Sequence, residues 1–355
     1  MTHLRWIMPR LVLLVMTWSC ITCFGWSNKE HIQLTRIAVE RLLADPSTPD
    51  AFGQWLRHVT PGLLDMAGEE QFFLHQTVGE SARGYEGLLH WATEPDARAT
   101  RDPRNKLVES FGIPERKLHF VDLELLWSAG RRLGYRDDLS GKPSLNDIPP
   151  DPADPHWKEA GMLPFRVQQC YQKLVECFRD GKLQPAFDGD EDHAIRWAGY
   201  LAHYLEDNTQ PQHATVDYKS QSYFKDRRHA PNVHAEMEYR MVDEGRGEFL
   251  ELRREYWPLF VTALDLPDPI QTKDLWRATL EVSLLSYDAL PLIGHAARQA
   301  TGSENHLNTA EFFHYQEDLH GRPITVMQMK ARQTAWAVIR AQRLLLMAWN
   351  ESRGN

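Results

Sequence analysis

The run from His203 to His213 constrains the fold of this chain more than any other stretch. His203 and Asp207 are four residues apart, so on a helix they lie on one face, separated by one turn. Pro211 ends that helix, because its ring clashes with the preceding turn and it has no N–H to donate. The break brings His213 round beside the helix end. Two imidazoles and a carboxylate at one point are typical zinc ligands, although an exposed helix with an ordinary His and Asp has the same spacing.

The position of Asp207 gives a second reason to expect a bound cation. Asp207 falls in the last predicted turn of the helix, near the negative end of the helix dipole, where a carboxylate costs ~0.3–1 kcal/mol. A divalent metal ion would offset that cost many times over.

The first 25 residues have the features of a signal peptide. The first ten residues contain two arginines, and an apolar stretch follows at 11–24. Small residues then precede a predicted cleavage site. The apolar stretch is too short to span a bilayer. We therefore predict that the mature protein begins at Trp26 and is exported, to be either secreted or periplasmic; a retained membrane anchor is the alternative.

Downstream of this segment the apolar residues recur mainly at helical spacing. With 355 residues, 42% hydrophobic and 25% charged, the chain can bury a large core. The helical pattern is clear near 163–178 and 195–205, and in the C-terminal third at about 247–265, 271–299 and 323–350. No strand-like alternation, repeat or linker stands out. The sequence predicts an all-α, single-domain, multi-helix bundle over 26–355 with long loops, such as the proline-rich stretch 141–155.

Charge and cysteine content limit the partners and the covalent structure. The formal net charge is −9, so the basic surface that drives binding to duplex nucleic acid is missing and we expect no such binding. Cys170 and Cys177 lie on one predicted helix, ~10 Å apart along its axis. A disulfide needs Cα atoms within ~7 Å. We predict no internal disulfide and two thiols that face the core.

The start of the predicted mature chain contains a further candidate ligand. Ser27 and Glu30 form a capping box that begins the first helix and places His31 in its first turns. Alone, His31 is typical of a surface histidine near a helix start. If Trp26 is the mature N-terminus, its amine and carbonyl oxygen can chelate a metal ion together with His31.

Three more segments carry a histidine or a carboxylate where a side chain could be held in place. Asp96 follows a proline, in a loop after an apolar helix. His119 begins a His-Phe-Val-Asp run. Asn232 is a good N-cap for a helix that carries His234 and Glu238 one turn apart. Taken alone, the pair His234 and Glu238 is more typical of a solvated helix face.

Together and in this order, the pieces resemble the zinc-dependent phospholipase C family and the related single-strand-specific zinc nucleases. The matching pieces are the predicted N-terminal Trp26, His31, His119-Phe-x-Asp122, His203-x3-Asp207-x5-His213 and His234-x3-Glu238. They span 26–238, and the helix from Thr334 to Trp349 resembles the last helix of the family. The resemblance implies an all-helical single domain around three zinc ions.

The resemblance also implies how the ligands divide among the three ions. The first zinc would take Asp96, His119, His203 and Asp207. The second would take the amine and carbonyl of Trp26, with His31 and a bridging Asp207. The third would take His213, His234 and Glu238. Glu94 and Asp102 are alternatives to Asp96, because the family has an Asp ahead of this histidine at a shorter spacing.

The activity implied by the resemblance is hydrolysis of phosphodiesters. A hydroxide between two zinc ions would attack phosphorus, with Asp207 bridging the ions and Asp96 orienting or deprotonating the water. The substrate would be a phospholipid, with transient contact to a membrane surface, or a nucleotide phosphodiester. A phospholipase C-like enzyme is the first expectation, a single-strand nuclease the second, and a non-catalytic zinc-binding protein the alternative from another class.

Details of the motifs point to both branches of the family. Glu238 and the sequence Thr-Gln-Pro-Gln-His-Ala resemble the phospholipases, whereas the step of five residues from Trp26 to His31 resembles the nucleases. Phe120 and Asp122 correspond to residues that bind a base in the nucleases. A core phenylalanine and a carboxylate that orients the preceding histidine are equally consistent with these two positions.

Overall fold

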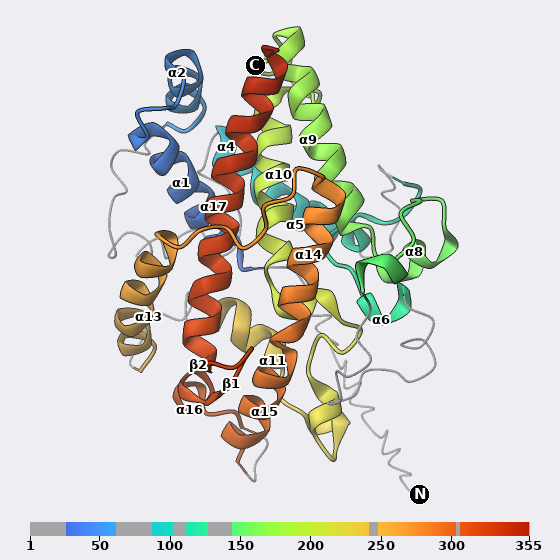
Figure 1. Ribbon diagram of the computed structural model, residues 1–355, viewed down its shortest axis with the longest axis vertical. Coiled ribbons are helices and arrows are strands. Elements are labelled where there is room, and N and C mark those ends of the chain that lie inside the picture. The colour runs from blue at the N-terminus through green and yellow to red at the C-terminus, as the bar shows by residue number, and fades with distance from the viewer. Residues whose placement is uncertain are drawn as a thin grey trace, which may run out of the picture.

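Most of the chain that the structure describes is helical, which confirms the all-α class (Figure 1). The structure is a computed structural model that describes residues 26–61, 87–101, 111–126, 144–240, 248–302 and 306–354. The predicted signal peptide and Asp102 lie outside these ranges. Within them, none of the helices combines the length and the apolarity needed to cross a bilayer.

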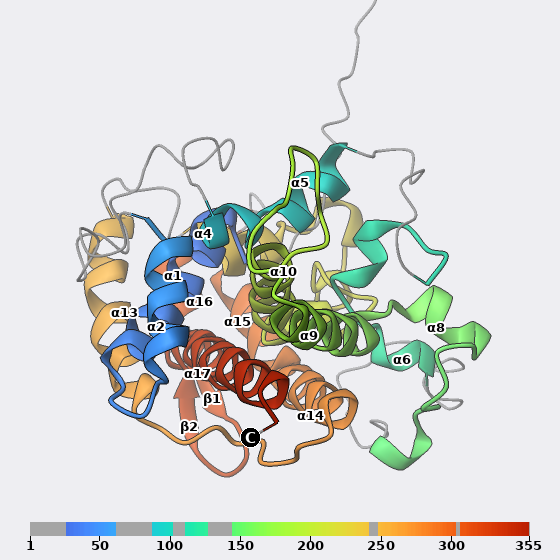
Figure 2. The same ribbon diagram turned by 90° about the horizontal axis from the view of Figure 1, so that it is seen from above.

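The long C-terminal helix, α17 (Val326–Ser352), forms the middle of the molecule (Figures 1 and 2). It begins at a capping box, in which Thr325 Oγ1 accepts from the Gln328 N–H and the Gln328 side chain accepts from the Thr325 N–H. Its most extensive contacts are with four helices: α1 (Asn28–Ala44), α9 (Leu163–Asp180), α10 (Ala194–Asn208) and α13 (Glu248–Leu264). One apolar core runs through these contacts, from Trp26 to Trp349.

Helix α10 is buried along its whole length. The sequence predicts a single buried stripe on it, but all of its residues are buried, as is typical of a helix at the centre of a large protein. Its neighbours include α9, α17, α4 (Gly87–Trp91), α1 and α14 (Leu275–Asp288). Polar side chains on α10 are therefore enclosed by protein on every side.

The remaining elements are shorter. The α-helices are α2 (Asp50–Val59), α5 (Glu94–Arg101), α6 (Leu123–Leu126), α8 (Pro155–Ala160), α11 (Val233–Ala235), α15 (Leu290–Ala300) and α16 (Thr309–His314). The 3-10 turns are η3 (Glu115–Leu118), η5 (Leu145–Asp147), η6 (Pro211–Ala214), η7 (Gln221–Tyr223) and η8 (Arg227–His229), and η9 (Glu236–Arg240) is a π-helix.

Two predictions about the C-terminal third are wrong in detail. The helix predicted at 271–299 is two helices, α14 and α15, separated at Ala289. Pro291 lies in the first turn of α15, the position of a helix that accommodates proline best. The chain also contains a small antiparallel hairpin, in which β1 (Gln316–Asp318) pairs with β2 (Pro323–Thr325). Strands of three residues are too short to show an alternating pattern in the sequence.

Cys170 and Cys177 are both free thiols in the core, as predicted. Burial raises the pKa of Cys170 to about 11 and that of Cys177 to about 12. The two thiols are therefore protonated at neutral pH and pack as small apolar groups.

Candidate metal centre

The end of α10 has the break that the sequence predicts, but His213 groups with His234 and Glu238 rather than with His203 and Asp207. The helix ends at Asn208, and Pro211 begins the 3-10 turn η6, which carries His213. Asp207 lies in the last helical turn, as expected. The Nδ1 of His213 donates to the carbonyl oxygen of His119 at 2.7 Å. The proline break therefore connects the end of α10 to the segment that supplies another predicted ligand.

His119, His203 and Asp207 meet in the interior. The Oδ2 of Asp207 lies 3.2 Å from the Nε2 of His203 and 2.9 Å from the Nδ1 of His119. The same two nitrogens are 3.1 Å apart. All three side chains are at most 2% exposed, so this is an enclosed group of side chains that could hold a metal ion and not a solvated helix face.

His31 and Asp96 complete this first cluster. The Nε2 of His31 is 3.5 Å from the Oδ1 of Asp207 and 3.9 Å from the Oδ2 of Asp96. The Oδ1 of Asp96 is 3.5 Å from the Nδ1 of His119 and 3.7 Å from the Nε2 of His203. The rings of His31 and His203 stack with centroids 4.0 Å apart. The structure thus brings together all five side chains that the sequence predicts for the two paired ions.

Asp96 reaches the cluster in an unexpected way. The sequence predicts a loop after its proline, but Asp96 lies in the first turn of α5, since proline is compatible with the start of a helix. Glu94, one of the alternatives, instead pairs with Arg98 at 3.4 Å and contacts Arg101. The side chain of Glu94 is therefore engaged outside the cluster.

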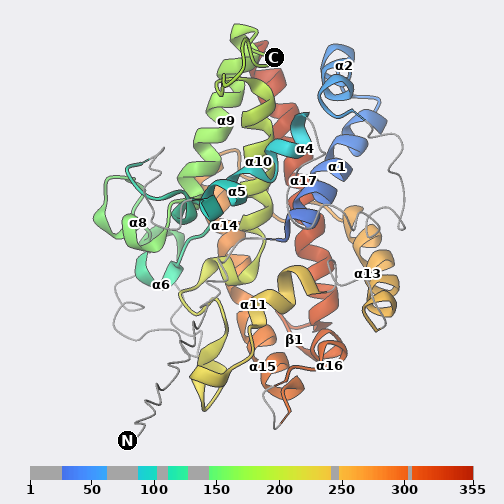
Figure 3. The same cartoon turned by 180° about the vertical axis from the view of Figure 1, so that it is seen from behind.

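A second cluster forms from His213, His234 and Glu238. The Oε1 of Glu238 lies 3.6 Å from the Nε2 of His213 and forms a short contact with the Nε2 of His234. Asn232 caps α11 as predicted, accepting from the Ala235 N–H. Figure 3 shows the side of the molecule on which α5, α11 and the end of α10 lie.

The helix that carries the second cluster is irregular. The sequence predicts one regular helix from Asn232 onwards, but α11 gives way to the π-helix η9 at Glu236. A π-helix leaves one extra residue per turn and is frequent at functional sites. The Glu238 side chain that faces the two histidines is on this π-helix.

Three of the histidines are oriented through their second ring nitrogen. The Nδ1 of His31 donates to Glu206 at 2.6 Å, and that of His203 donates to the Ala92 carbonyl oxygen at 2.8 Å. The Nδ1 of His213 is held in the same way by the His119 carbonyl oxygen. Each ring therefore turns its Nε2 towards its cluster. In metal sites, hydrogen bonds of this kind orient the histidines that bind the ion.

Glu206 and Ala92 are supporting positions of the first cluster that the sequence does not reveal. The Oε1 of Glu206 also accepts from the hydroxyl of Thr35 at 2.9 Å, which fixes the carboxylate from both sides. The only signal was a second acidic residue next to Asp207, in a helix that carries few other charges. A backbone carbonyl such as that of Ala92 leaves no trace in a sequence.

The close packing of α10 against α4 explains how Ala92 reaches His203. Gly199 lies one turn before His203, and a Cβ on it would be 2.6 Å from the Cβ of Trp91 and 2.8 Å from the nitrogen of Ala92. Any side chain would separate the two helices. The glycine therefore permits the hydrogen bond that orients His203.

Burial and neighbouring charges shift the pKa of five groups in these clusters: Asp96, His203, Asp207, His31 and His234. Burial raises the pKa of Asp96 to about 8. Burial opposes the charged form of His203, but Asp207 and Asp96 outweigh it and raise the pKa to about 9. Burial likewise opposes ionised Asp207, yet His203 holds its pKa well below the usual range. Burial keeps the pKa of His31 and His234 well below the usual range, so both are neutral, as metal ligands must be.

The clusters also contain polar atoms that lack a protein hydrogen bond. Within the part of the chain that the structure describes, these buried atoms include the Nε2 of His31, His119 and His234 and the Oδ1 of Asp96 and Asp207. Buried polar atoms are nearly always satisfied, and those that are not call for an ion or water. Imidazole nitrogens with carboxylate oxygens form the donor set of zinc. The two buried clusters can therefore hold metal ions.

Trp26 lies beside the first cluster, but its predicted ligand atoms stay a prediction. Its side chain is fully buried, and the indole N–H donates to the Thr209 hydroxyl at 3.2 Å. Thr209 directly follows the last turn of α10. The indole thus fixes the start of α1 against the end of the helix that carries Asp207.

Phe120 and Asp122 are half-buried and form contacts of their own. Lys117 lies over the Phe120 ring at 5.1 Å. Burial raises the pKa of Asp122 to about 8, with Glu124 adding to the effect. Within the described residues, the carboxylate that contacts the His119 ring at hydrogen-bond distance is Asp207, so the structure gives no support to Asp122 as the residue that orients it.

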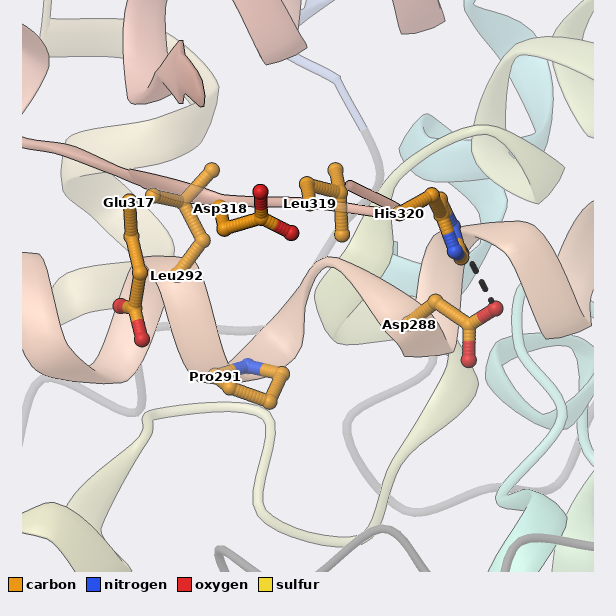
Figure 4. Close-up of a pocket in the computed structure, with 7 residues that line it drawn as sticks. All are labelled: Asp288, Pro291, Leu292, Glu317, Asp318, Leu319 and His320. Atoms are coloured by element: carbon orange, nitrogen blue, oxygen red, sulfur yellow. Dashed lines mark ion pairs between the residues drawn. The ribbon is translucent and has the colours of Figure 1, made fainter. Parts of the chain in front are cut away.

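A separate hollow lies at the hairpin (Figure 4). It encloses about 300 Å³ and is lined by Asp288, Pro291, Leu292, Glu317, Asp318, Leu319 and His320. The His320 Nε2 is 3.5 Å from the Asp288 Oδ2. None of these residues belongs to either cluster, so the candidate metal centre is distinct from this hollow.

Comparison of the chain with protein-family models, with curated proteins and with solved structures finds no match. A proposal about function therefore depends on the residues and their geometry.

Proposed function

We propose that this protein is an exported, zinc-dependent phosphodiesterase of the phospholipase C type that holds three zinc ions. The proposal is supported mainly by one observation: eight predicted ligand side chains lie together in two buried clusters. They come from segments that are far apart in the sequence, and several of their buried atoms have no protein hydrogen bond. Such an arrangement costs free energy unless an ion compensates it.

The division of the ligands follows the clusters. The first cluster, which is His31, Asp96, His119, His203 and Asp207, would hold a close pair of zinc ions with the Trp26 main chain. The second cluster, which is His213, His234 and Glu238, would hold the third. When bound, the ions would activate water and neutralise charge on a phosphate group.

The residues of the chain have separate tasks in this proposal. Asp207 faces His31 with one carboxylate oxygen and His119 and His203 with the other, which suits a bridge between two ions. The Oδ1 of Asp96 has no hydrogen-bond partner among the described residues. Without an ion its pKa is about 8; bound cations would favour its ionised form, and in this proposal that form accepts a proton from the attacking water. Glu206 and the Ala92 carbonyl keep the histidines in the required orientation.

One observation favours the nuclease as a second candidate. Phe120 directly follows His119 and is half-buried, and in this candidate function its ring would stack on a nucleobase. Stacking of a base on an aromatic ring contributes ~1–3 kcal/mol in proteins that bind single strands.

The test is hydrolysis of a chromogenic phosphodiester by the purified protein, with zinc content measured on the same preparation. We expect activity that is lost on chelation and restored by zinc. His295→Gln is a matched control, because this histidine pairs with Glu317 outside the clusters and its loss should leave activity unchanged. A protein that binds three zinc ions without hydrolysing any phosphodiester would be a non-catalytic zinc protein. Comparing a phosphatidylcholine dispersion with single-stranded DNA then separates phospholipase from nuclease.

A further inference from the structure

A fully buried lysine connects the two parts of the chain that flank the metal clusters. Lys330, on the first turns of α17, is 0% exposed. Its ammonium group is 2.7 Å from the Oε1 of Glu30, which is also 0% exposed. It lies over the Trp26 ring at 4.4 Å from the centroid. On this side, the lysine holds the start of α1.

The same ammonium group also binds the π-helix that carries Glu238. It donates to the carbonyl oxygen of Met237 at 2.5 Å and approaches that of Glu238 at 3.4 Å. In a π-helix the regular i→i−4 hydrogen bonds are interrupted, so main-chain carbonyls can accept from other donors. A charged donor makes a stronger hydrogen bond than a neutral one, particularly where water is excluded.

The position of Glu238 depends on this contact. Its side chain faces His213 and His234, while its carbonyl oxygen faces Lys330. An ammonium group anchored to the 27-residue helix α17 fixes the backbone of η9 from the opposite side.

We propose that Lys330 is a positioning residue for the second cluster: it ties the backbone of Glu238 to the Trp26–Glu30 segment and so keeps the third metal site assembled. The proposal rests on the proposed function in one respect, namely that the second cluster holds an ion. Lys330 acts on that ion only through the backbone of η9, and its ammonium group binds main-chain oxygens there.

A purely structural role makes a different prediction. If Lys330 only neutralises Glu30, then removing both charges together should restore the site. Three variants separate the two cases: Lys330→Met, which removes the donor but keeps the chain length; Glu30→Gln, which keeps the donor; and the double variant, which leaves no unpaired buried charge. The double variant also covers the case in which Lys330→Met alone does not fold, because an isolated buried carboxylate is costly.

Two measurements are made on each variant. Zinc binding is followed by competition with a chromophoric chelator, and amide deuterium exchange of residues 236–240 is followed in metal-free protein. We expect Lys330→Met and the double variant to bind the weakest zinc at least ~10-fold less tightly and to exchange faster at 236–240. Glu30→Gln should keep the affinity and the exchange of the wild-type protein.

The outcomes decide between the roles. Wild-type zinc affinity and exchange in the double variant would overturn the proposal and leave Lys330 as the counter-charge of Glu30. A wild-type protein that binds no third ion would count against the proposed function alone, because the exchange measurement needs no metal. Unchanged amide exchange at 236–240 in both variants that lack Lys330 would refute the proposal that Lys330 fixes the backbone of η9.

Discussion

Replacing Gly199 with alanine tests whether the contact between α10 and α4 orients His203. The new Cβ would lie 2.6 Å from the Cβ of Trp91, 2.7 Å from its carbonyl carbon and 2.8 Å from the nitrogen of Ala92. Carbon atoms in contact are normally ~3.5–4 Å apart, so α4 has to retreat by roughly 1 Å. Such overpacking typically costs ~1–3 kcal/mol, while alanine recovers ~1 kcal/mol of helix propensity. We expect a loss of stability of up to about 2 kcal/mol.

The effect of Gly199→Ala on metal binding should be larger than its effect on stability. The hydrogen bond from His203 Nδ1 to the Ala92 oxygen is 2.8 Å long, and a retreat of roughly 1 Å takes it beyond hydrogen-bond range. Loss of an outer partner of a metal-binding histidine lowers metal affinity by ~10–100-fold. Competition titration with zinc and a chromophoric chelator measures this directly, and thermal unfolding measures stability.

Gly53→Ala is the matched control for this experiment. Gly53 also lies within a helix, α2, but the atom nearest to its added Cβ is the Nη1 of Arg57 at 3.6 Å, an ordinary contact. This variant should keep or raise the stability and leave zinc affinity unchanged. Wild-type zinc affinity in Gly199→Ala would refute the argument that helix spacing sets the orientation of His203.

Four further outcomes are expected. Asp207→Asn should remove two ions and lower phosphodiester hydrolysis at least ~100-fold, which zinc analysis and kinetics would show; a loss of one ion only would disprove the bridge. Glu206→Gln should weaken zinc binding ~10–100-fold in the same titration, and an unchanged affinity would exclude the orienting role. Extending the mature protein by one residue before Trp26 should impair zinc binding, because a peptide nitrogen cannot replace an amine; equal zinc content would remove Trp26 as a ligand. Because burial raises the pKa of Cys170 to about 11 and of Cys177 to about 12, alkylation should be slow at pH 8 in native protein and accelerate towards those pH values and on unfolding; fast native reaction at pH 8 would contradict their burial.

The sequence predicts the side chains of the two clusters better than the backbone that presents them. Histidine and carboxylate spacing is a local property, so the pairs at His203 and His234 are recognisable from the sequence alone. The long gap between Asp96 and His119 could not be judged in that way, because α5 and its first-turn aspartate depend on a proline that is compatible with both a loop and a helix start.

The supporting partners could not be predicted from the sequence because they depend on tertiary contacts. Glu206 is 175 residues from His31, and the Ala92 oxygen belongs to the backbone. Gly199 would be taken for a weak position in a helix, whereas in the structure it marks the closest approach of α4. The π-helix at Glu236 and the three-residue strands of the hairpin likewise have no local pattern of their own.

The distance in sequence between α1 and α10 has a consequence for the order of assembly. His31 cannot meet Glu206 until α10 has been synthesised and docked, and Lys330 adds a contact 300 residues after Glu30. Contacts of such high sequence separation form late and slowly. We therefore expect the helices to collapse first and the ions to enter an almost finished protein, so that zinc added after refolding should produce the same centre as zinc present throughout.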